Sequence, residues 1–340
     1  MDAFTSGFTC DEKTPRRGSR PLVSRMKDAR IKTFYTPNQV LEHGATGNFS
    51  RSPQKPRLLM EYLAGQGLAG YFEVAGDFPP FTDEDFRAAH AAEYVDAFFA
   101  GRQPLASSNG LSWSREFADT VRYTNASLYQ AIDAAIARPQ QVTFSPTSGF
   151  HHAQPEAGSG YCTFRGQVIA SIKIYRELGI AGAYLDLDGH FGNSIEDSRG
   201  FVLDLDQAIP RGCNINPAGT HAEYVESFQS QLETLHKQIV SGHVGYVVFC
   251  HGADSHEADD LHGQCTTAEW VKCSQFFYDW VADVEASTGV SLPVTLSLFD
   301  GYRRDNYDSV LALHTVDLVT CLNRLCGHEL GYEVNVAPRT

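Results

Sequence analysis

The sequence predicts an α/β fold in which helices cover both faces of a central, mostly parallel sheet. Apolar runs of strand length alternate with longer amphipathic segments of helix length. Crossover units of this kind place neighbouring strands parallel and cover the sheet on both sides. No internal repeat or low-complexity tract interrupts the pattern. We therefore expect one domain over residues 31–340, a size that such sheets reach as single units.

The predicted strands are short apolar runs bounded by turn residues. In chain order they are residues 31–35, 141–144, 183–187, 201–205, 245–250 and 292–299. The predicted helices repeat apolar residues at the spacing of one helix face and comprise 116–137, a segment within 159–177, 223–240, 268–286 and 306–323. The Pro- and Ser-containing stretch 102–113 is predicted to be a long functional loop.

Bulk composition narrows the class of protein. Residues 1–30 are rich in Lys and Arg and are predicted to form a basic arm, read as a solvated tail or as a subunit or site contact. The net charge of −14 argues against a nucleic-acid partner. Eight cysteines without a Cys-x-x-Cys pair suit reduced thiols. With no signal-like segment and none long enough to span a membrane, we expect a cytoplasmic enzyme.

The end of the predicted strand 183–187 is the most informative segment. Asp186, Asp188 and His190 occupy every second position there. Strand side chains alternate between faces, so these three can project from one side. Two carboxylates and an imidazole held close together repel each other unless a cation or proton lies among them. The segment therefore favours a divalent metal, with a solvated strand end as the alternative.

Three other predicted strands also end in polar residues. They are followed by a histidine pair, by a histidine-flanked aspartate and by an aspartate and tyrosine, in the sequences Gly149-Phe-His151-His152-Ala153, Gly252-Ala-Asp254-Ser-His256 and Asp300-Gly-Tyr302. In parallel sheets, ligands gather at the carboxyl ends of the strands. Each motif alone is consistent with a polar loop, a helix cap or a turn. Their joint appearance at successive strand ends predicts a single site.

In order and spacing, these motifs resemble the zinc-dependent histone deacetylases and acetylpolyamine amidohydrolases of the arginase–deacetylase superfamily. The resemblance also includes Gly158-Ser-Gly160-Tyr161-Cys162 and Asp186-x-Asp188-x-His190-x-Gly192-Asn193, and looser similarity covers residues 34–56 and 90–95. It implies the three-layer fold of that superfamily. It also implies one catalytic Zn²⁺ per chain, bound by Asp188, His190 and Asp254. Such an oxygen-rich set would accept Fe²⁺, Mn²⁺ or Co²⁺ as well.

The same resemblance assigns catalytic roles. His152 corresponds to the histidine that takes a proton from the activated water and passes one to the leaving amine, and His151 is its electrostatic companion. Asp186 corresponds to the carboxylate that orients His151, and Asn193 to the residue that holds His152. Tyr302 corresponds to the tyrosine that stabilises the oxyanion. The substrate tunnel of the family implies that Gly160 and Tyr161 bind the acyl arm.

Several positions depart from the family pattern. Asp300 replaces a usual glycine, where it could stiffen the tyrosine loop or add a charge near the mouth. Phe191 replaces a second histidine, Lys55 lies near the place of a family arginine, and Tyr161 replaces a common phenylalanine. A structural K⁺ often lies behind the metal in the family. Asp204 is placed beside that K⁺ site, where a salt contact could substitute for the ion.

The leading functional hypothesis is metal-dependent removal of an acetyl or other acyl group from acetyl-lysine, an acetylpolyamine or a small-molecule amide. One alternative is a catalytically impaired deacetylase-like binding protein, suggested by Asp300 and Phe191. The other is an arginase-like ureohydrolase, which needs two metals. The expected partners are a small-molecule or acetyl-lysine substrate and, where subunits wall the entrance, a second copy of the chain, with neither nucleic acid nor membrane.

Overall fold

The computed structural model describes residues 25, 27–41, 47, 49–261 and 263–337. Most of the predicted basic arm, 1–30, lies outside the described residues. Within them, seven parallel strands form one sheet in the order β2-β1-β3-β7-β6-β4-β5. The strands are β1 (Ile31–Phe34), β2 (Phe72–Ala75), β3 (Thr143–Ser145), β4 (Gly182–Asp186), β5 (Asn214–Ile215), β6 (Tyr246–Cys250) and β7 (Val294–Ser297).

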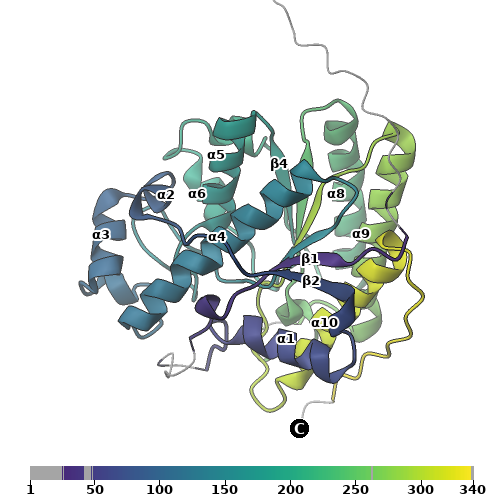
Figure 1. Ribbon diagram of the computed structural model, residues 1–340, viewed down its shortest axis with the longest axis horizontal. Helices are drawn as coiled ribbons and strands as arrows, with labels where there is room; N and C mark the ends of the chain where they lie inside the picture. Colours follow the sequence, from purple (N-terminus) through teal and green to yellow (C-terminus); the bar gives the residue numbers. More distant parts are fainter. Residues whose placement is uncertain (1–24, 26, 42–46, 48, 262, 338–340) are drawn as a thin grey trace, which may run out of the picture.

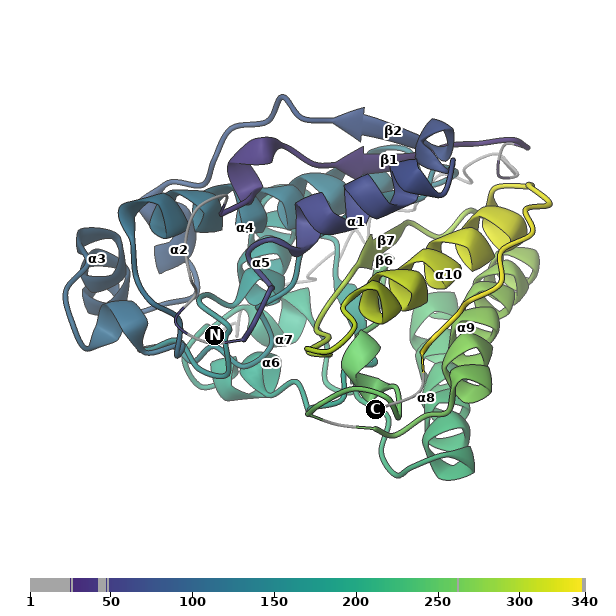
Figure 2. The same ribbon diagram turned by 90° about the horizontal axis from the view of Figure 1, so that it is seen from below.

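Helices cover both faces of this sheet and make a three-layer α/β fold, as predicted (Figures 1 and 2). Helix α4 packs on β1, β3 and β7 and on α5, while α8, α9 and α10 pack side by side, with α1 against α10. The helices are α1 (Lys55–Gly65), α2 (Asp83–Arg87), α3 (Ala92–Ala100), α4 (Arg115–Ala137), α5 (Gly166–Leu178), α6 (Ser194–Ser198), α7 (Leu205–Ala208), α8 (Ala222–Val240), α9 (Thr267–Thr288) and α10 (Asp308–Leu325). Short 3-10 turns are η1 (Pro37–Gln39), η2 (Ala69–Tyr71), η3 (Leu105–Ser107) and η4 (Ala253–Ser255).

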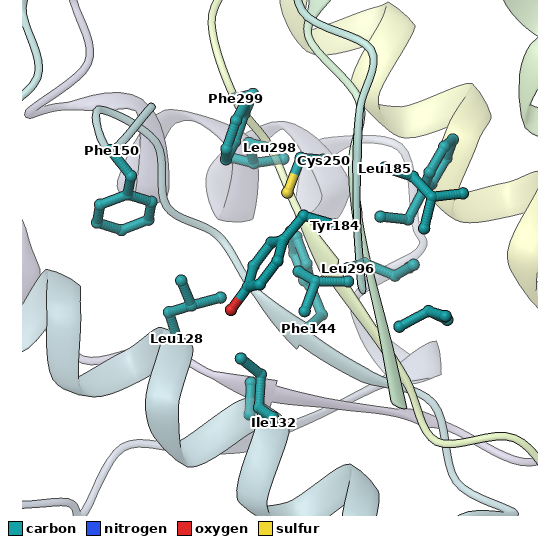
Figure 3. Packing of buried hydrophobic residues seen from close by; sticks show 14 of the residues in the cluster. Leu128, Ile132, Phe144, Phe150, Tyr184, Leu185, Cys250, Leu296, Leu298 and Phe299 are labelled. Atoms are coloured by element: carbon teal, nitrogen blue, oxygen red, sulfur yellow. The ribbon is translucent and has the colours of Figure 1, made fainter. Parts of the chain in front are cut away.

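The longest helix, α4, shows how sequence pattern becomes packing. Ser114 caps its start by accepting the Phe117 N–H at 3.0 Å. Leu128 and Ile132, four residues apart, lie on one face and point toward the sheet (Figure 3). There they join the buried cluster that contains the side chains of β3, β4 and β7. Burying each such aliphatic side chain contributes about 1.5–3 kcal/mol, so the apolar stripe suffices to dock the helix.

One predicted strand is wrong. Residues 201–205 form turns that lead into α7, and the strand beside β4 is β5, which comes later in the chain. Leu203 is 96 % exposed, and Asp204 pairs with Arg176 at the surface, 2.7 Å away. Residues 201–205, although they form an apolar run of strand length, therefore do not pair with the edge of the sheet. Asp204 consequently does not lie on the strand next to the metal-ligand strand, and the placement of a K⁺ neighbour on it is also wrong.

The topology determines where the polar strand ends meet. Strands β3, β7, β6 and β4 are consecutive neighbours in the middle of the sheet. Because they are parallel, the segments that follow them emerge at one edge. The histidine pair, the tyrosine loop, the Asp254 turn and the Asp188 segment follow these four strands in that order. Among the described helices, none is long and apolar enough to cross a membrane.

Candidate active site

The three predicted metal ligands come together just beyond β4 and β6. Their ligand atoms all lie within 4.8 Å of one another. His190 Nδ1 is 3.3 Å from Asp188 Oδ1 and 2.9 Å from Asp254 Oδ2. Backbone N–H groups fix both carboxylates, since His190 N donates to Asp188 and Gly189 N donates to Asp254. The predicted grouping of Asp188, His190 and Asp254 is therefore present in the fold.

The electrostatics of this group require a positive charge. Burial and the neighbouring Asp188 raise the pKa of Asp254 to about 6. Burial would lower the pKa of His190, but its hydrogen bonds to Asp188 and Asp254 raise it to about 10. A proton on His190 thus offsets the repulsion between two buried carboxylates. Two carboxylates and an imidazole around one point are also a donor set for a divalent cation, so these residues fit a metal.

Packing fixes the turn that carries Asp254. Trp270 of α9 donates its Nε1–H to the Gly252 carbonyl at 3.0 Å. A Cβ at Gly252 would lie 2.5 Å from Asp254 Oδ1 and 2.8 Å from Asp188 Cα. Only glycine therefore lets the turn after β6 approach the Asp188 backbone this closely. His256, which sequence reasoning grouped with the site, instead hydrogen-bonds Thr267.

His152 is held in a defined tautomer. Its Nδ1 is 2.9 Å from Asn193 Oδ1, and the Asn193 amide nitrogen donates to Asp197. Because a carboxylate only accepts, the Asn193 amide must direct its oxygen at His152, whose Nδ1 therefore carries the hydrogen. Nε2 of His152 is left with the lone pair that a general base needs. Burial and the charge of His151 lower the pKa of His152 and favour this neutral form.

His151 has the opposite electrostatic environment. Its Nδ1 is 3.0 Å from Asp186 Oδ2, and its Nε2 is 3.6 Å from Asp188 and 3.9 Å from Asp300. Burial alone would lower the pKa of His151, but these carboxylates, Asp186 first, raise it to about 10. The two adjacent histidines, whose ring centroids are 4.0 Å apart, thus favour different protonation states. This division matches an acid–base pair in which only His152 exchanges protons.

Tyr302 lies in the loop that follows β7, and its ring is close to His190 of the ligand group. It is 4 % exposed, and burial followed by the charge of Asp300 raises its pKa well above the ordinary value. The hydroxyl therefore keeps its proton and can donate a hydrogen bond. The Tyr302 ring centroid is 6.4 Å from that of His190 and 5.7 Å from that of Tyr161. Phe49 completes an aromatic wall, 5.9 Å from Tyr161 and 6.1 Å from Tyr302.

The predicted tunnel residues adopt unusual backbone conformations. Gly160 and Tyr161 have φ angles of 51° and 63°, in the left-handed region. A Cβ on Gly160 would lie 2.8 Å from the His152 ring, so this position admits only glycine. Tyr161 is held by its N–H, which donates to the Asn109 carbonyl at 2.9 Å. Asn109 belongs to the predicted functional loop 102–113, which therefore does shape the site.

The departures from the family pattern lie on different sides of the site. Asp300 is buried beside His151 and 3.8 Å from the buried Lys55 Nζ, which donates to the Phe299 carbonyl. Its charge is thus behind the catalytic groups, and the expectation of a charge at the mouth is wrong. Phe191, which stands where the family has a second histidine, is 63 % exposed to solvent.

Sequence reasoning assigned no role to two groups at this site. Asp197, one helical turn after Asn193, orients its amide, and the i, i+4 spacing was the available signal. Cys162 lies with His151 and Asp300 in a second set of ligand atoms, again within 4.8 Å of one another. Burial raises the pKa of the Cys162 thiol well above its ordinary value, which disfavours the thiolate that binds metals.

Comparison with known proteins agrees with the resemblance seen in the sequence. A sequence model of the histone deacetylase domain matches residues 50–202. This match supports a relationship to the histone deacetylase and acetylpolyamine amidohydrolase family. The matched segment carries His151, His152, Asp188 and His190, whereas Asp254 and Tyr302 lie beyond it in sequence and reach the site through the fold.

Two curated relatives are similar to parts of the chain. The chain is 25 % identical over 254 residues to a histone deacetylase-like amidohydrolase of Pseudomonas aeruginosa, covering 64 % of each chain. It is 25 % identical over 223 residues to the chloroplastic histone deacetylase 14 of Arabidopsis thaliana, covering 59 % of this chain and 51 % of that protein. The chain thus spans about half to two thirds of these relatives.

Two solved structures share the fold over most of the chain, although their sequence identity to it is low. The HD domain of HDA15 superposes with a TM-score of 0.67 at 15 % identity, over 87 % of this chain and 90 % of that one. An acetylpolyamine aminohydrolase of Burkholderia pseudomallei gives 0.61 at 18 % identity, over 86 % and 98 %. These similarities confirm the predicted α/β architecture.

Proposed function

We propose that this chain is a metal-dependent amidohydrolase that hydrolyses linear N-acyl amides, acetyl amides foremost, to a carboxylate and a primary amine. The observation that carries the proposal is the unequal histidine pair beside the ligand group. Asn193 and Asp197 leave a lone pair on His152 Nε2, while three carboxylates keep His151 cationic. A base and a fixed positive charge side by side serve the hydrolysis of an unactivated amide.

Asp188, His190 and Asp254 would hold the metal, and zinc is the leading candidate, with Fe²⁺, Mn²⁺ and Co²⁺ compatible with the same donors. The bound ion would polarise the substrate carbonyl and lower the pKa of water. Three protein ligands leave room for both.

The protein groups divide the remaining work. His152 Nε2 takes the proton that water loses as its oxygen adds to the carbonyl carbon. Tyr302 donates its hydroxyl hydrogen bond to the carbonyl oxygen as negative charge develops there. His152 then returns the proton to the amide nitrogen, and the C–N bond breaks to give a neutral amine and a carboxylic acid. The acid loses its remaining proton to solvent and leaves as the carboxylate. His151 stays protonated and stabilises the negative charge that accumulates beside it.

The aromatic wall supports a slender acyl-amine substrate. Phe49, Tyr161 and Tyr302 contact one another in edge-on or tilted arrangements, and the Tyr302 ring also lies edge-on to His190 of the ligand group. Gly160 adds a flat backbone surface against His152. An unbranched alkyl-amide arm suits such a wall, so acetyl-lysine, acetylpolyamines and small-molecule N-acetyl amides are the candidate substrates.

The test uses purified protein loaded with Zn²⁺ and a panel of acetylated lysine peptides, polyamines and small amines, with acetate release as the readout. We expect hydrolysis of at least one class. His152→Ala and Tyr302→Phe should each nearly abolish it. The control Asp279→Ala, which removes an exposed aspartate of α9 that pairs with Arg324, should not. Activity that survives both site variants would contradict the proposed roles.

A second candidate is a two-metal ureohydrolase, favoured by one observation. His151, Cys162 and Asp300 form a second set of potential ligand atoms, and His151 Nε2 is 3.6 Å from Asp188 of the first set. Metal analysis after zinc loading separates the two functions. One ion per chain with acetate release supports the deacetylase, whereas two ions with urea release from guanidino substrates support the alternative. Tight metal and hydroxamate binding without any hydrolysis would instead support the impaired binding protein.

A further inference from the structure

The loop that carries Tyr302 is held through its backbone by aspartate side chains. It runs from the end of β7 to α10 without regular secondary structure, so no strand or helix partner fixes its N–H groups. Three alternate amides each donate to a carboxylate. Asp300 N donates to Asp188 at 3.1 Å, Tyr302 N to Asp259 at 2.7 Å and Arg304 N to Asp260 at 3.0 Å.

The middle contact is the most specific. Asp259 is 3 % exposed, and its two oxygens accept different backbone amides, Oδ2 from Tyr302 and Oδ1 from Leu261 at 2.9 Å. Hydrogen bonds from backbone amides to a carboxylate are about twice as strong as neutral ones. One carboxylate thus ties the tyrosine loop to the segment that follows Asp254.

We propose that Asp259 is a positioning residue that sets the location of the Tyr302 hydroxyl by accepting the Tyr302 backbone N–H. This inference rests on the proposed function and adds a residue to its machinery. Asp254 and Asp259 are five residues apart on one short segment. The same segment therefore supplies a metal ligand and the anchor of the oxyanion donor, which fixes the distance between the two groups that act on the carbonyl.

The neighbouring contacts show why one anchor at this point is decisive. The Asp300 carbonyl accepts the Ala253 N–H at 2.6 Å, so the residue two positions before Tyr302 is already tied to the Asp254 turn. Asp260 holds Arg304 two positions after it, through both the backbone and the side chain. Of these three carboxylate contacts, the one from Asp259 acts on Tyr302 itself. Without it, the tyrosine backbone is free to move between two fixed points.

The burial of the charged Asp259 side chain also indicates a role beyond folding. Burial raises the pKa of Asp259 to about 6, so the protein keeps this carboxylate ionised in an environment that penalises its charge. Its oxygens contact two backbone amides that water would otherwise solvate. A buried carboxylate whose charge its surroundings disfavour is a candidate for function.

The experiment compares Asp259→Ala, Asp259→Asn and the control Asp279→Ala on the zinc-loaded enzyme. A misplacement of about 1 Å at a catalytic group typically costs about a hundredfold in rate. We expect Asp259→Ala to lower kcat about tenfold to a hundredfold with KM within about twofold. Asp259→Asn keeps one acceptor oxygen for Tyr302 and should lose less than Asp259→Ala. The control should match the wild-type enzyme.

A double-mutant cycle separates positioning from a general structural role. If Asp259 acts through the Tyr302 hydroxyl, adding Asp259→Ala to Tyr302→Phe should change the residual rate less than about twofold. Hydrogen exchange gives a readout independent of turnover. Peptides covering 300–306 should exchange faster in Asp259→Ala, while peptides of α4 should not.

The outcomes are distinct. Wild-type protein that hydrolyses no acyl amide refutes the proposed function, and the inference with it. Active wild-type enzyme with unchanged kcat in Asp259→Ala refutes the inference alone. The inference also fails if Asp259→Ala lowers kcat by the same factor in the wild-type enzyme and in the Tyr302→Phe variant. If Asp259→Ala does not fold, Asp259→Asn is run through the same cycle, and additive losses there overturn the positioning role.

Discussion

Exchanging Asn193 and Asp197, as Asn193→Asp with Asp197→Asn, should move the pH dependence of catalysis without changing the net charge. In the native chain, an amide contacts His152 Nδ1 and passes its own N–H to the carboxylate of Asp197. In the exchanged protein, the carboxylate contacts the imidazole directly and the new amide still donates to it. The hydrogen-bond chain is preserved, and only the position of the negative charge changes.

The size of the effect follows from that displacement. Moving a unit charge from about 7 Å to about 4 Å from an imidazolium at an effective dielectric constant of about 20 adds about 2 kcal/mol of attraction. This favours the protonated form of His152, and about 1.4 kcal/mol corresponds to one pH unit. The lowered pKa of His152 places the midpoint of the acid limb of kcat/KM below pH 6.5 in the native enzyme. In the exchanged protein this midpoint should move to higher pH by about one unit.

The direction of this pKa shift can be measured from the reaction rate at acidic pH. A general base works when it is neutral, so raising its pKa leaves less active enzyme in acid, and the rate at pH 6 should fall much more than the rate at pH 8. Initial rates on an acetylated reporter between pH 5 and 9 measure this. Asp197→Asn alone removes the distant charge and should move the limb slightly downward. An unchanged limb in the exchanged protein would show that His152 is not the titrating base.

Further predictions concern the other groups of the site. Tyr302→Phe should lower kcat about a hundred- to a thousandfold with little change in KM. A loss of kcat below tenfold in steady-state kinetics would exclude Tyr302 as the oxyanion donor. Gly160→Ala should lower kcat more than tenfold and destabilise the fold, because its Cβ meets the His152 ring and its φ is positive; unaltered rates and melting temperature would contradict this. Chelation of the metal should abolish activity and lower the melting temperature, because an ion that binds only the folded ligand set adds its binding free energy to the stability, and Zn²⁺ should restore both; equal melting curves with and without zinc would argue against the ligand set.

Much of the site could be predicted because its chemistry is concentrated in short motifs at strand ends. The alternation of Asp186, Asp188 and His190 gave their common direction, and the order of the other motifs placed the histidine pair and Tyr302 on the same rim. A parallel sheet carries its strand ends to one edge whatever the exact strand order. For that reason the grouping of the ligands followed from sequence, although the order β3-β7-β6-β4 did not.

Other features depended on contacts between distant segments. The apolar run 201–205 had the pattern of a strand, but the edge of β4 is filled by β5, so the run remains at the surface. Of the two roles considered for Asp300, a stiffer tyrosine loop or a charge near the mouth, the second is wrong, because Asp300 is buried beside Lys55 and His151. Propensity and periodicity carry no information about which of two segments reaches an edge or which way a loop side chain turns, because tertiary packing decides both.

By itself, the sequence predicted the fold class and, through short motifs at strand ends that resemble a known family, the three candidate metal ligands, the histidine pair and the tyrosine. Only the tertiary structure decided the protonation pattern of the histidines and the attachment of the tyrosine loop. Both depend on carboxylates that approach from elsewhere in the chain, Asp197 behind Asn193 and Asp259 beneath Tyr302. Hydrogen bonds of this kind are set by distances of a few tenths of an ångström, which only the packed chain fixes.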